Sequence, residues 1–151
     1  APAIAVPAAQ ATPADAQSDD APLGPGRILV VDDNAVNRHV VVRMLGNTGV
    51  DIDVACDGLE AVAACRSRHY GLVLMDCQMP ELDGFDATRT IRADEPAGVH
   101  TPIVALTANA MDGDRERCLA AGMDDYLAKP VTATALRAIV RMHFVPDTGG
   151  A

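Results

Sequence analysis

Positive charge is scarce in this chain of 151 residues, in which 12 Lys and Arg residues face 21 Asp and Glu residues and the formal net charge is −9. Binding to nucleic acid needs clustered positive charge, and so does adsorption to an anionic membrane, so both classes of function are disfavoured. Long apolar runs are also lacking, since none approaches the roughly 20 residues of a membrane-spanning helix. The length suits one domain of ordinary size.

Signatures of several cofactor sites are missing too. The four cysteines form no Cys-x-x-Cys pair and no cluster with histidine, which disfavours a zinc site or a disulfide framework and indicates buried thiols in a reducing compartment. No glycine fingerprint of a flavin- or dinucleotide-binding loop occurs. The histidines have no second histidine or acid partner at ligand spacing, so we expect them at the surface or at helix ends. They are His39, His69, His100 and His143.

Residues 1–26 differ in composition from the rest of the chain. They contain nine Ala and five Pro but no basic or aromatic residue, and the prolines favour extended, solvated backbone. We interpret them as an inter-domain linker without fixed structure, followed by one domain at residues 27–145 and a short tail at residues 146–151. Because residue 1 is Ala rather than Met, we expect the chain to be a piece of a longer protein.

Short apolar runs alternate with segments of helical period from Arg27 onward. Residues 28–31, 72–75 and 103–106 are continuous apolar runs, typical of parallel strands that are covered on both faces. Residues 51–55 alternate polar and apolar side chains, as in an edge strand, and residues 124–128 are a shorter fifth candidate. Apolar stripes mark five helices between and after the strands. We assign these stripes to Val36, Val40 and Met44; to Leu59, Val62 and Ala63; to Phe85, Thr88 and Ile91; to Met111, Arg115, Cys118 and Leu119, a mixed face; and to Leu136, Ile139, Val140 and His143.

Five strand–helix units in strict alternation predict an α/β fold, with a doubly wound, five-stranded parallel sheet and right-handed crossovers. If the second strand is the edge, the strand order is 2-1-3-4-5, the flavodoxin-like arrangement. Such sheets bind ligands beyond the carboxyl ends of their strands, where the strand order reverses. Here that reversal falls between the first and third strands.

The central strands of this predicted sheet each end on a residue with an ionisable or hydroxyl group. These residues are Asp32, Asp33, Asp76, Thr107 and Lys129. Three carboxylates at one edge repel one another, and a divalent cation removes that conflict. Mg²⁺ prefers oxygen ligands and keeps several waters, which leaves open positions for the oxygens of a phosphoryl group. The only lysine of the chain and a threonine hydroxyl would neutralise the remaining phosphoryl oxygens.

Four segments carry a resemblance to a known family. VVDDNAVNR (30–38), LVLMDCQMPELDGF (72–85), PIVALTANAM (102–111) and GMDDYLAKPV (122–131) resemble the receiver domain of two-component signalling, in the CheY-like superfamily. The resemblance covers roughly residues 27–145, and it is strongest to the receivers of bacterial hybrid sensor histidine kinases.

The resemblance implies a role for each candidate residue. Asp76 would accept the phosphoryl group, and Asp33 would bind Mg²⁺ (or Mn²⁺) together with Asp76 and the backbone carbonyl of Gln78, while Asp32 would hold a metal-bound water. Lys129 would bind the phosphoryl group, through a cis peptide bond to Pro130. Two further residues would act as the switch, Thr107 by moving toward the phosphoryl oxygen and Tyr126 by rotating inward.

The family also implies partners. A receiver takes its phosphoryl group from the phosphohistidine of a kinase dimerisation domain, or exchanges it with a histidine phosphotransfer domain. The partner's phosphohistidine-bearing helix would dock on the face of the first helix around Val36, Arg38 and His39. We expect a cytoplasmic monomer or weak dimer with no nucleic-acid or direct membrane contact, whether or not a parent kinase is anchored in the inner membrane. The domain itself would not be a turnover enzyme, although its parent would be a histidine kinase.

The sequence leaves three alternatives to a hybrid-kinase receiver. A phosphohydrolase of the haloacid-dehalogenase type also combines Asp, Thr, Lys and Mg²⁺, but it carries its nucleophile on the first strand in an Asp-x-Asp pattern, whereas that strand here ends in Asp32, Asp33 and Asn34. A stand-alone response regulator and an unphosphorylated pseudo-receiver that works as a docking module both fit the same fold.

Overall fold

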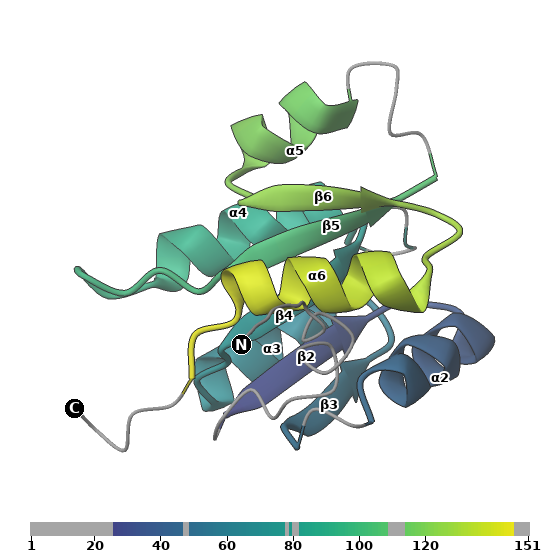
Figure 1. The fold of residues 1–151 in the computed structure, drawn as a ribbon. Helices are drawn as coiled ribbons and strands as arrows, with labels where there is room; N and C mark the ends of the chain where they lie inside the picture. The colour runs from purple at the N-terminus through teal and green to yellow at the C-terminus, as the bar shows by residue number, and fades with distance from the viewer. Residues whose placement is uncertain (1–25, 47–48, 78, 80–81, 109–113, 147–151) are drawn as a thin grey trace, which may run out of the picture.

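The computed structural model describes residues 26–46, 49–77, 79, 82–108 and 114–146. Strands and helices alternate through these residues (Figure 1). They are β2 (Arg27–Val31), α2 (Ala35–Met44), β3 (Asp51–Ala55), α3 (Gly58–Ser67), β4 (Leu72–Asp76), α4 (Gly84–Asp94), β5 (Ile103–Thr107), α5 (Asp114–Ala121), β6 (Asp125–Ala128) and α6 (Ala133–His143).

The strands form one parallel sheet in the order β3-β2-β4-β5-β6. Counted along the chain, this is the predicted order 2-1-3-4-5, so the fold prediction is confirmed. Every residue of β4 and β5 is buried, as expected of strands that helices cover on both faces. The alternating strand β3 lies at the edge of the sheet, next to β2, also as predicted.

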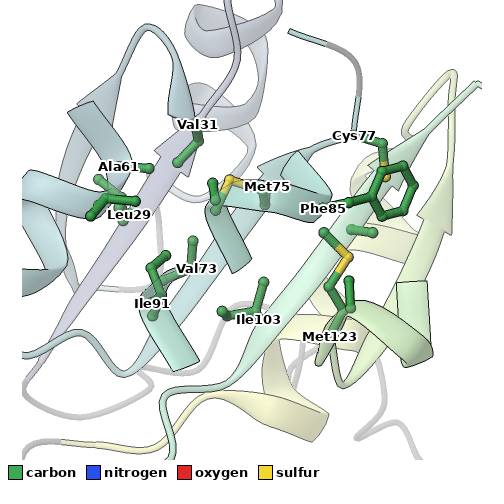
Figure 2. Packing of buried hydrophobic residues seen from close by; sticks show 14 of the residues in the cluster. Leu29, Val31, Ala61, Val73, Met75, Cys77, Phe85, Ile91, Ile103 and Met123 are labelled. Carbon is green, nitrogen blue, oxygen red and sulfur yellow. The ribbon is translucent and has the colours of Figure 1, made fainter. Parts of the chain in front are cut away.

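Two hydrophobic clusters fill the spaces on either side of the sheet, because successive strand residues point to opposite faces. Leu29, Val73 and Ile103 point to the face that α3, α4 and α5 cover, and Figure 2 shows this cluster with Leu29 and Ala61 toward one end and Cys77 and Phe85 toward the other. The residues next to them in sequence point to the face that α2 and α6 cover. The sheet is therefore rigidly held between two helical layers.

Side-chain caps begin several helices. Asp57 accepts a hydrogen bond from the backbone N–H of Glu60 at 2.8 Å, and the Glu60 carboxylate accepts one from the backbone N–H of Cys56 at 2.8 Å. The pair resembles a capping box, except that Glu60 bonds the N–H of the residue before the N-cap rather than that of Asp57 itself. Asn34, Asp83 and Thr132 cap α2, α4 and α6 in the same general way.

Two of the predicted apolar stripes are only partly right: Met44 of the α2 stripe and Val62 of the α3 stripe pack in the core, but the other residues of these stripes do not. The inner face of α2 is made by Val41, with Leu45 just beyond the helix, whereas Val36 and Val40 are exposed. In α3, Leu59 is exposed and Ala61 takes the inward position. Short helices rich in Val and Ala carry apolar residues on both faces, so periodicity alone does not decide which face is inside. The stripes predicted for α4 and α6 are confirmed. Of the α5 stripe, Cys118 is buried, Arg115 and Leu119 are exposed, and Met111 lies outside the described residues.

The histidines lie at the surface or at a helix end, as predicted, but the expectation that none has an acid partner is wrong for two of them. His100 Nε2 lies 2.6 Å from a carboxylate oxygen of Asp124, and His143 Nε2 lies 2.9 Å from one of Asp125. The two acids are 24 and 18 residues away in sequence, so only the packing of the chain against β6 brings each pair together.

The predicted linker and tail fall almost entirely outside the described residues, at 1–25 and 147–151. Among the helices that the structure describes, none is both long enough and apolar enough to cross a membrane.

Candidate functional site

Four strands deliver the predicted site residues to the carboxyl edge of the sheet. Asp32 follows β2, Asp76 ends β4, Thr107 ends β5 and Lys129 follows β6. Because all strands are parallel, these ends lie at one edge and near the point where the strand order reverses. Topology alone thus collects residues that are up to 97 positions apart in sequence.

Three carboxylates form a cluster at this edge. One oxygen from each of Asp32, Asp33 and Asp76 lies within 4.8 Å of the others. Asp32 is only 2% exposed and Asp76 only 4%, whereas Asp33 is open to solvent. Like charges this close, with two of them out of water, are held together only if a positive charge lies near.

Lys129 supplies that charge. Its Nζ lies 3.2 Å from Asp76 Oδ1 and 3.6 Å from Asp32 Oδ2. Its backbone is fixed by a hydrogen bond of 2.8 Å from its N–H to the Thr107 carbonyl, and its peptide bond to Pro130 is cis, as predicted. The ammonium group therefore contacts both buried carboxylates.

Asp32 is held in place by its neighbours in the chain. Its Oδ1 accepts a hydrogen bond of 2.9 Å from the backbone N–H of Asn34, whose own side chain caps α2. Arg38 Nη1 donates a 2.7 Å hydrogen bond to the Asp32 carbonyl. Sequence reasoning placed Arg38 on a docking face and missed this contact, which requires the helix and the loop to be folded against each other.

The loop after β4 folds back onto the strand end through Gly84. A Cβ atom at this position would lie 2.3 Å from the Asp76 carbonyl oxygen, closer than any side chain allows. The Gly84 N–H also donates to the Cys77 carbonyl at 3.2 Å. Only glycine permits this approach, so Gly84 helps to set where the Asp76 backbone lies.

The remaining predicted residues are placed less completely. Thr107 is buried at the end of β5, and Tyr126 lies half-buried in β6, opposite Ala105 of β5 and against the hydrophobic cluster of that face. Gln78, the predicted source of a metal-binding carbonyl, lies outside the described residues.

An open groove of about 420 Å³ adjoins the carboxylate cluster. Asp32 and Lys129 form its polar end, while Val40 of α2 and Val131 line its apolar part. Val36, one turn before Val40 on α2, is 69% exposed. A polar reaction centre is thus flanked by an apolar helix surface.

The family description "Response regulator receiver domain" matches residues 28–141. A relative named hybrid signal transduction histidine kinase B, from Dictyostelium discoideum, is 42% identical over an alignment of 128 residues that covers 78% of this chain and 6% of the relative. This chain therefore spans only a small part of such a relative.

Two solved structures share the fold, one with a bound metal ion and one with a partner protein. The receiver domain of the sensor histidine kinase PA1611 from Pseudomonas aeruginosa PAO1, solved with a magnesium ion coordinated in its active site cleft, is 48% identical, with a TM-score of 0.72 over 80% of this chain and 98% of that one. The receiver domain of the response regulator Ssk1 from Saccharomyces cerevisiae, solved with the histidine phosphotransfer protein Ypd1, is 29% identical, with a TM-score of 0.74 over 80% and 90% of the two chains. With its sheet order, its acidic edge and these matches, the chain belongs to the response regulator receiver domains of two-component phosphorelay signalling and is homologous to the receivers of hybrid histidine kinases.

Proposed function

We propose that Asp76 accepts a phosphoryl group from a phosphohistidine in a reaction that depends on Mg²⁺. One observation carries the proposal: the Asp76 carboxylate lies at the edge of the sheet, beside two further carboxylates and within 3.2 Å of the only lysine of the chain. Three acids at this edge do not stabilise the fold, since their mutual repulsion opposes folding.

The donor set fits a divalent cation. Hard carboxylate oxygens within 4.8 Å of one another suit Mg²⁺, which needs only one or two such ligands and keeps several waters. Asp33 and Asp76 would bind the ion with the carbonyl of Gln78, and Asp32 would hold one of its waters. Mn²⁺ accepts the same ligands. The bound ion would neutralise charge on the transferring group.

The chain's own residues perform the rest of the transfer. A carboxylate oxygen of Asp76 forms the new bond to phosphorus while the bond from phosphorus to the donor imidazole nitrogen breaks, and the imidazole keeps that electron pair. Lys129 offsets the charge of the phosphoryl oxygens, and the Thr107 hydroxyl donates to one of them. Because Asp76 is buried and held by Gly84, little rearrangement is needed to position the carboxylate.

Thr107 and Tyr126 are the proposed switch. Both lie on the last two strands of the sheet, next to Lys129, and a new phosphoryl oxygen at Asp76 would draw the Thr107 hydroxyl toward it. Tyr126 is half-buried on the neighbouring strand, and it would rotate inward behind Thr107 in the phosphorylated state. The two states would differ in the surface that β5 and β6 present.

The exposed apolar face of α2 is the proposed docking site for the phosphohistidine-bearing helix. Val36 is 69% exposed and Val40 is 42% exposed, and Val40 lines the groove that leads to Lys129. His39 is exposed near them, whereas Arg38 is engaged with Asp32. The partner would be a kinase dimerisation domain or a histidine phosphotransfer domain, and the solved complex of Ssk1 with Ypd1 supports a partner of this kind.

We also propose a hybrid histidine kinase as the parent protein, with residues 1–26 as the linker, residues 27–145 as the receiver and residues 146–151 as a short tail. The receiver would act in the cytoplasm, as a monomer or weak dimer. The proposed linker joins β2 at the amino edge of the sheet, because β2 begins at Arg27, and the site lies at the opposite edge. A tether attached there leaves the α2 face accessible to a phosphohistidine.

Intact-mass spectrometry after incubation with acetyl phosphate tests the site. We expect one phosphoryl adduct that requires Mg²⁺ or Mn²⁺ and is absent from Asp76→Asn. The matched control is Asp86→Asn, an exposed acid paired with Arg89 on α4, which keeps the adduct. An adduct that persists in Asp76→Asn would move the acceptor elsewhere.

A phosphorylated histidine donor tests the partner class. We expect transfer from a phosphohistidine domain to the wild-type chain and none to Asp76→Asn. A folded wild-type chain that takes no phosphoryl group from either acetyl phosphate or phosphohistidine would be a pseudo-receiver, and the proposal would be wrong.

A further inference from the structure

Two buried cysteines meet directly behind the proposed acceptor. Cys77 follows Asp76 at the end of β4, and Cys118 lies on α5, 41 residues further along the chain. Their sulfur atoms are 4.0 Å apart, and the two residues are 2% and 0% exposed. Figure 2 places Cys77 beside Phe85 at one end of the hydrophobic cluster.

The two cysteines sit on backbones that are anchored to different degrees. The Cys77 N–H donates to the Leu106 carbonyl at 3.1 Å, and its carbonyl accepts from Gly84 at 3.2 Å, so Cys77 is joined to both β5 and α4. The Cys118 carbonyl accepts a 3.0 Å hydrogen bond from the Met123 N–H, just beyond the end of α5. Cys77 is thus joined to two neighbouring elements, and Cys118 to the segment that follows its own helix.

Helix α5 is held to the domain by little apolar surface. Among residues 115–121, only Cys118 and Ala121 are buried, and both side chains are small. Arg117 adds a contact at the rim, with its guanidinium 4.5 Å from the centre of the Phe85 ring. A helix attached by so little buried surface opens locally more often than the rest of the fold, and each opening uncovers the Cys118 thiol and the side of Cys77 that faces it.

We propose that Cys77 and Cys118 are a redox modification site, at which a peroxide closes a disulfide that ties α5 to the carboxyl end of β4. The bond requires the sulfur atoms to approach from 4.0 Å to about 2.0 Å, which side-chain rotation and a small shift of α5 provide. This inference does not depend on phosphoryl transfer.

The chemistry balances with hydrogen peroxide as the oxidant. The Cys118 sulfur attacks one peroxide oxygen, the O–O bond breaks, and a sulfenic acid and one water form. The Cys77 sulfur then attacks the Cys118 sulfur, the S–O bond breaks, and the oxygen leaves as a second water. The two thiols lose two hydrogens in total, and the peroxide is reduced to water.

The other two cysteines do not share this arrangement. Cys56 is exposed at the start of α3 and Cys65 is half-buried further along it, and both can be replaced without touching the pair. The test therefore uses the variant Cys56→Ser/Cys65→Ser, in which only Cys77 and Cys118 remain. Its matched control carries Cys118→Ala in addition.

The folded variant is treated with hydrogen peroxide, then alkylated under denaturing conditions and digested without reductant. We expect a peptide that joins Cys77 to Cys118, a mass shift equal to the loss of two hydrogens, and reversal by a thiol reductant. The control with Cys118→Ala shows no joined peptide. The proposal is overturned if the folded variant gives no joined peptide, or if the bond forms only after denaturant is added.

Hydrogen exchange of the reduced and oxidised variant provides a second measurement. We expect the amides of α5 to exchange more slowly in the oxidised form, because the disulfide prevents the local opening. Equal exchange in the two forms would overturn the claim that the bond ties down α5. Neither measurement uses a phosphoryl donor or Mg²⁺, so its failure is distinct from a failure of the proposed function.

Discussion

Replacing Lys129 with Met tests whether its ammonium group is the counter-charge that holds the buried carboxylates together. Met preserves most of the side-chain length and removes the charge. At an effective dielectric constant of about 20, each contact of the ammonium, at 3.2 Å from Asp76 and 3.6 Å from Asp32, corresponds to roughly 5 kcal/mol of attraction. Part of this is offset by the cost of desolvating the lysine, so we expect a net loss of about 2–4 kcal/mol in the free energy of unfolding without metal.

The assay is urea denaturation with and without Mg²⁺, and the matched control is Arg66→Met. Arg66 contacts Asp94 at 2.8 Å in an ion pair whose two side chains are exposed, so its removal is expected to cost about 0–1 kcal/mol with or without metal. Saturating Mg²⁺ reduces the difference in stability between Lys129→Met and the wild type. In the variant the bound ion neutralises the carboxylates, and in the wild type it repels the ammonium group. Equal losses for both variants in metal-free buffer would refute the counter-charge argument, and a loss at Lys129 unchanged by Mg²⁺ would place the metal elsewhere.

Three further predictions concern other parts of the chain. Val36→Asp leaves the adduct from acetyl phosphate intact but slows transfer from a phosphohistidine domain about tenfold or more, since a charge in the centre of an apolar contact costs at least about 1.4 kcal/mol; equal slowing with both donors would contradict a docking role. Gly84→Ala lowers the free energy of unfolding by about 2–4 kcal/mol in urea titrations, because its Cβ would meet the Asp76 carbonyl at 2.3 Å, and an unchanged midpoint would show that the loop moves freely. Burial raises the pKa of Cys65 from 9.0 to about 11, so below pH 9 its thiolate fraction is about one hundredth of that of an ordinary thiol. Cys65 is therefore alkylated much more slowly than exposed Cys56 at pH 8 until urea unfolds the chain, and equal rates in the folded protein would contradict this burial effect.

The sheet order was predictable because its signals are local. Continuous apolar runs mark β2, β4 and β5, and the alternating residues 51–55 mark the edge strand. Once the order of strands and helices is known, handedness and connection rules leave few topologies. The inner faces of α2 and α3 were less predictable, because Val36 and Leu59 are apolar residues that the fold leaves in solvent.

The grouping of Asp32, Asp76 and Lys129 followed from the same local signals. A residue that directly follows a parallel strand must lie at the carboxyl edge of the sheet, so knowing the strand ends places these side chains in one region. Their contact distances, and the contrast between buried Asp76 and exposed Asp33, depend on how the loops pack and were not available from spacing.

By itself, then, the sequence determined the fold class, the order of the strands and the residues that gather at one edge. Strand periodicity and strand ends are local features, each visible within a few consecutive residues. Only the tertiary structure decided which side chains touch. It joined Arg38 to the Asp32 carbonyl six residues before it, and it joined His100 to Asp124 and Cys77 to Cys118, two contacts between segments that no local pattern relates. Such contacts depend on the angles at which helices and loops pack against the sheet, and those angles are set by the shapes of many side chains together.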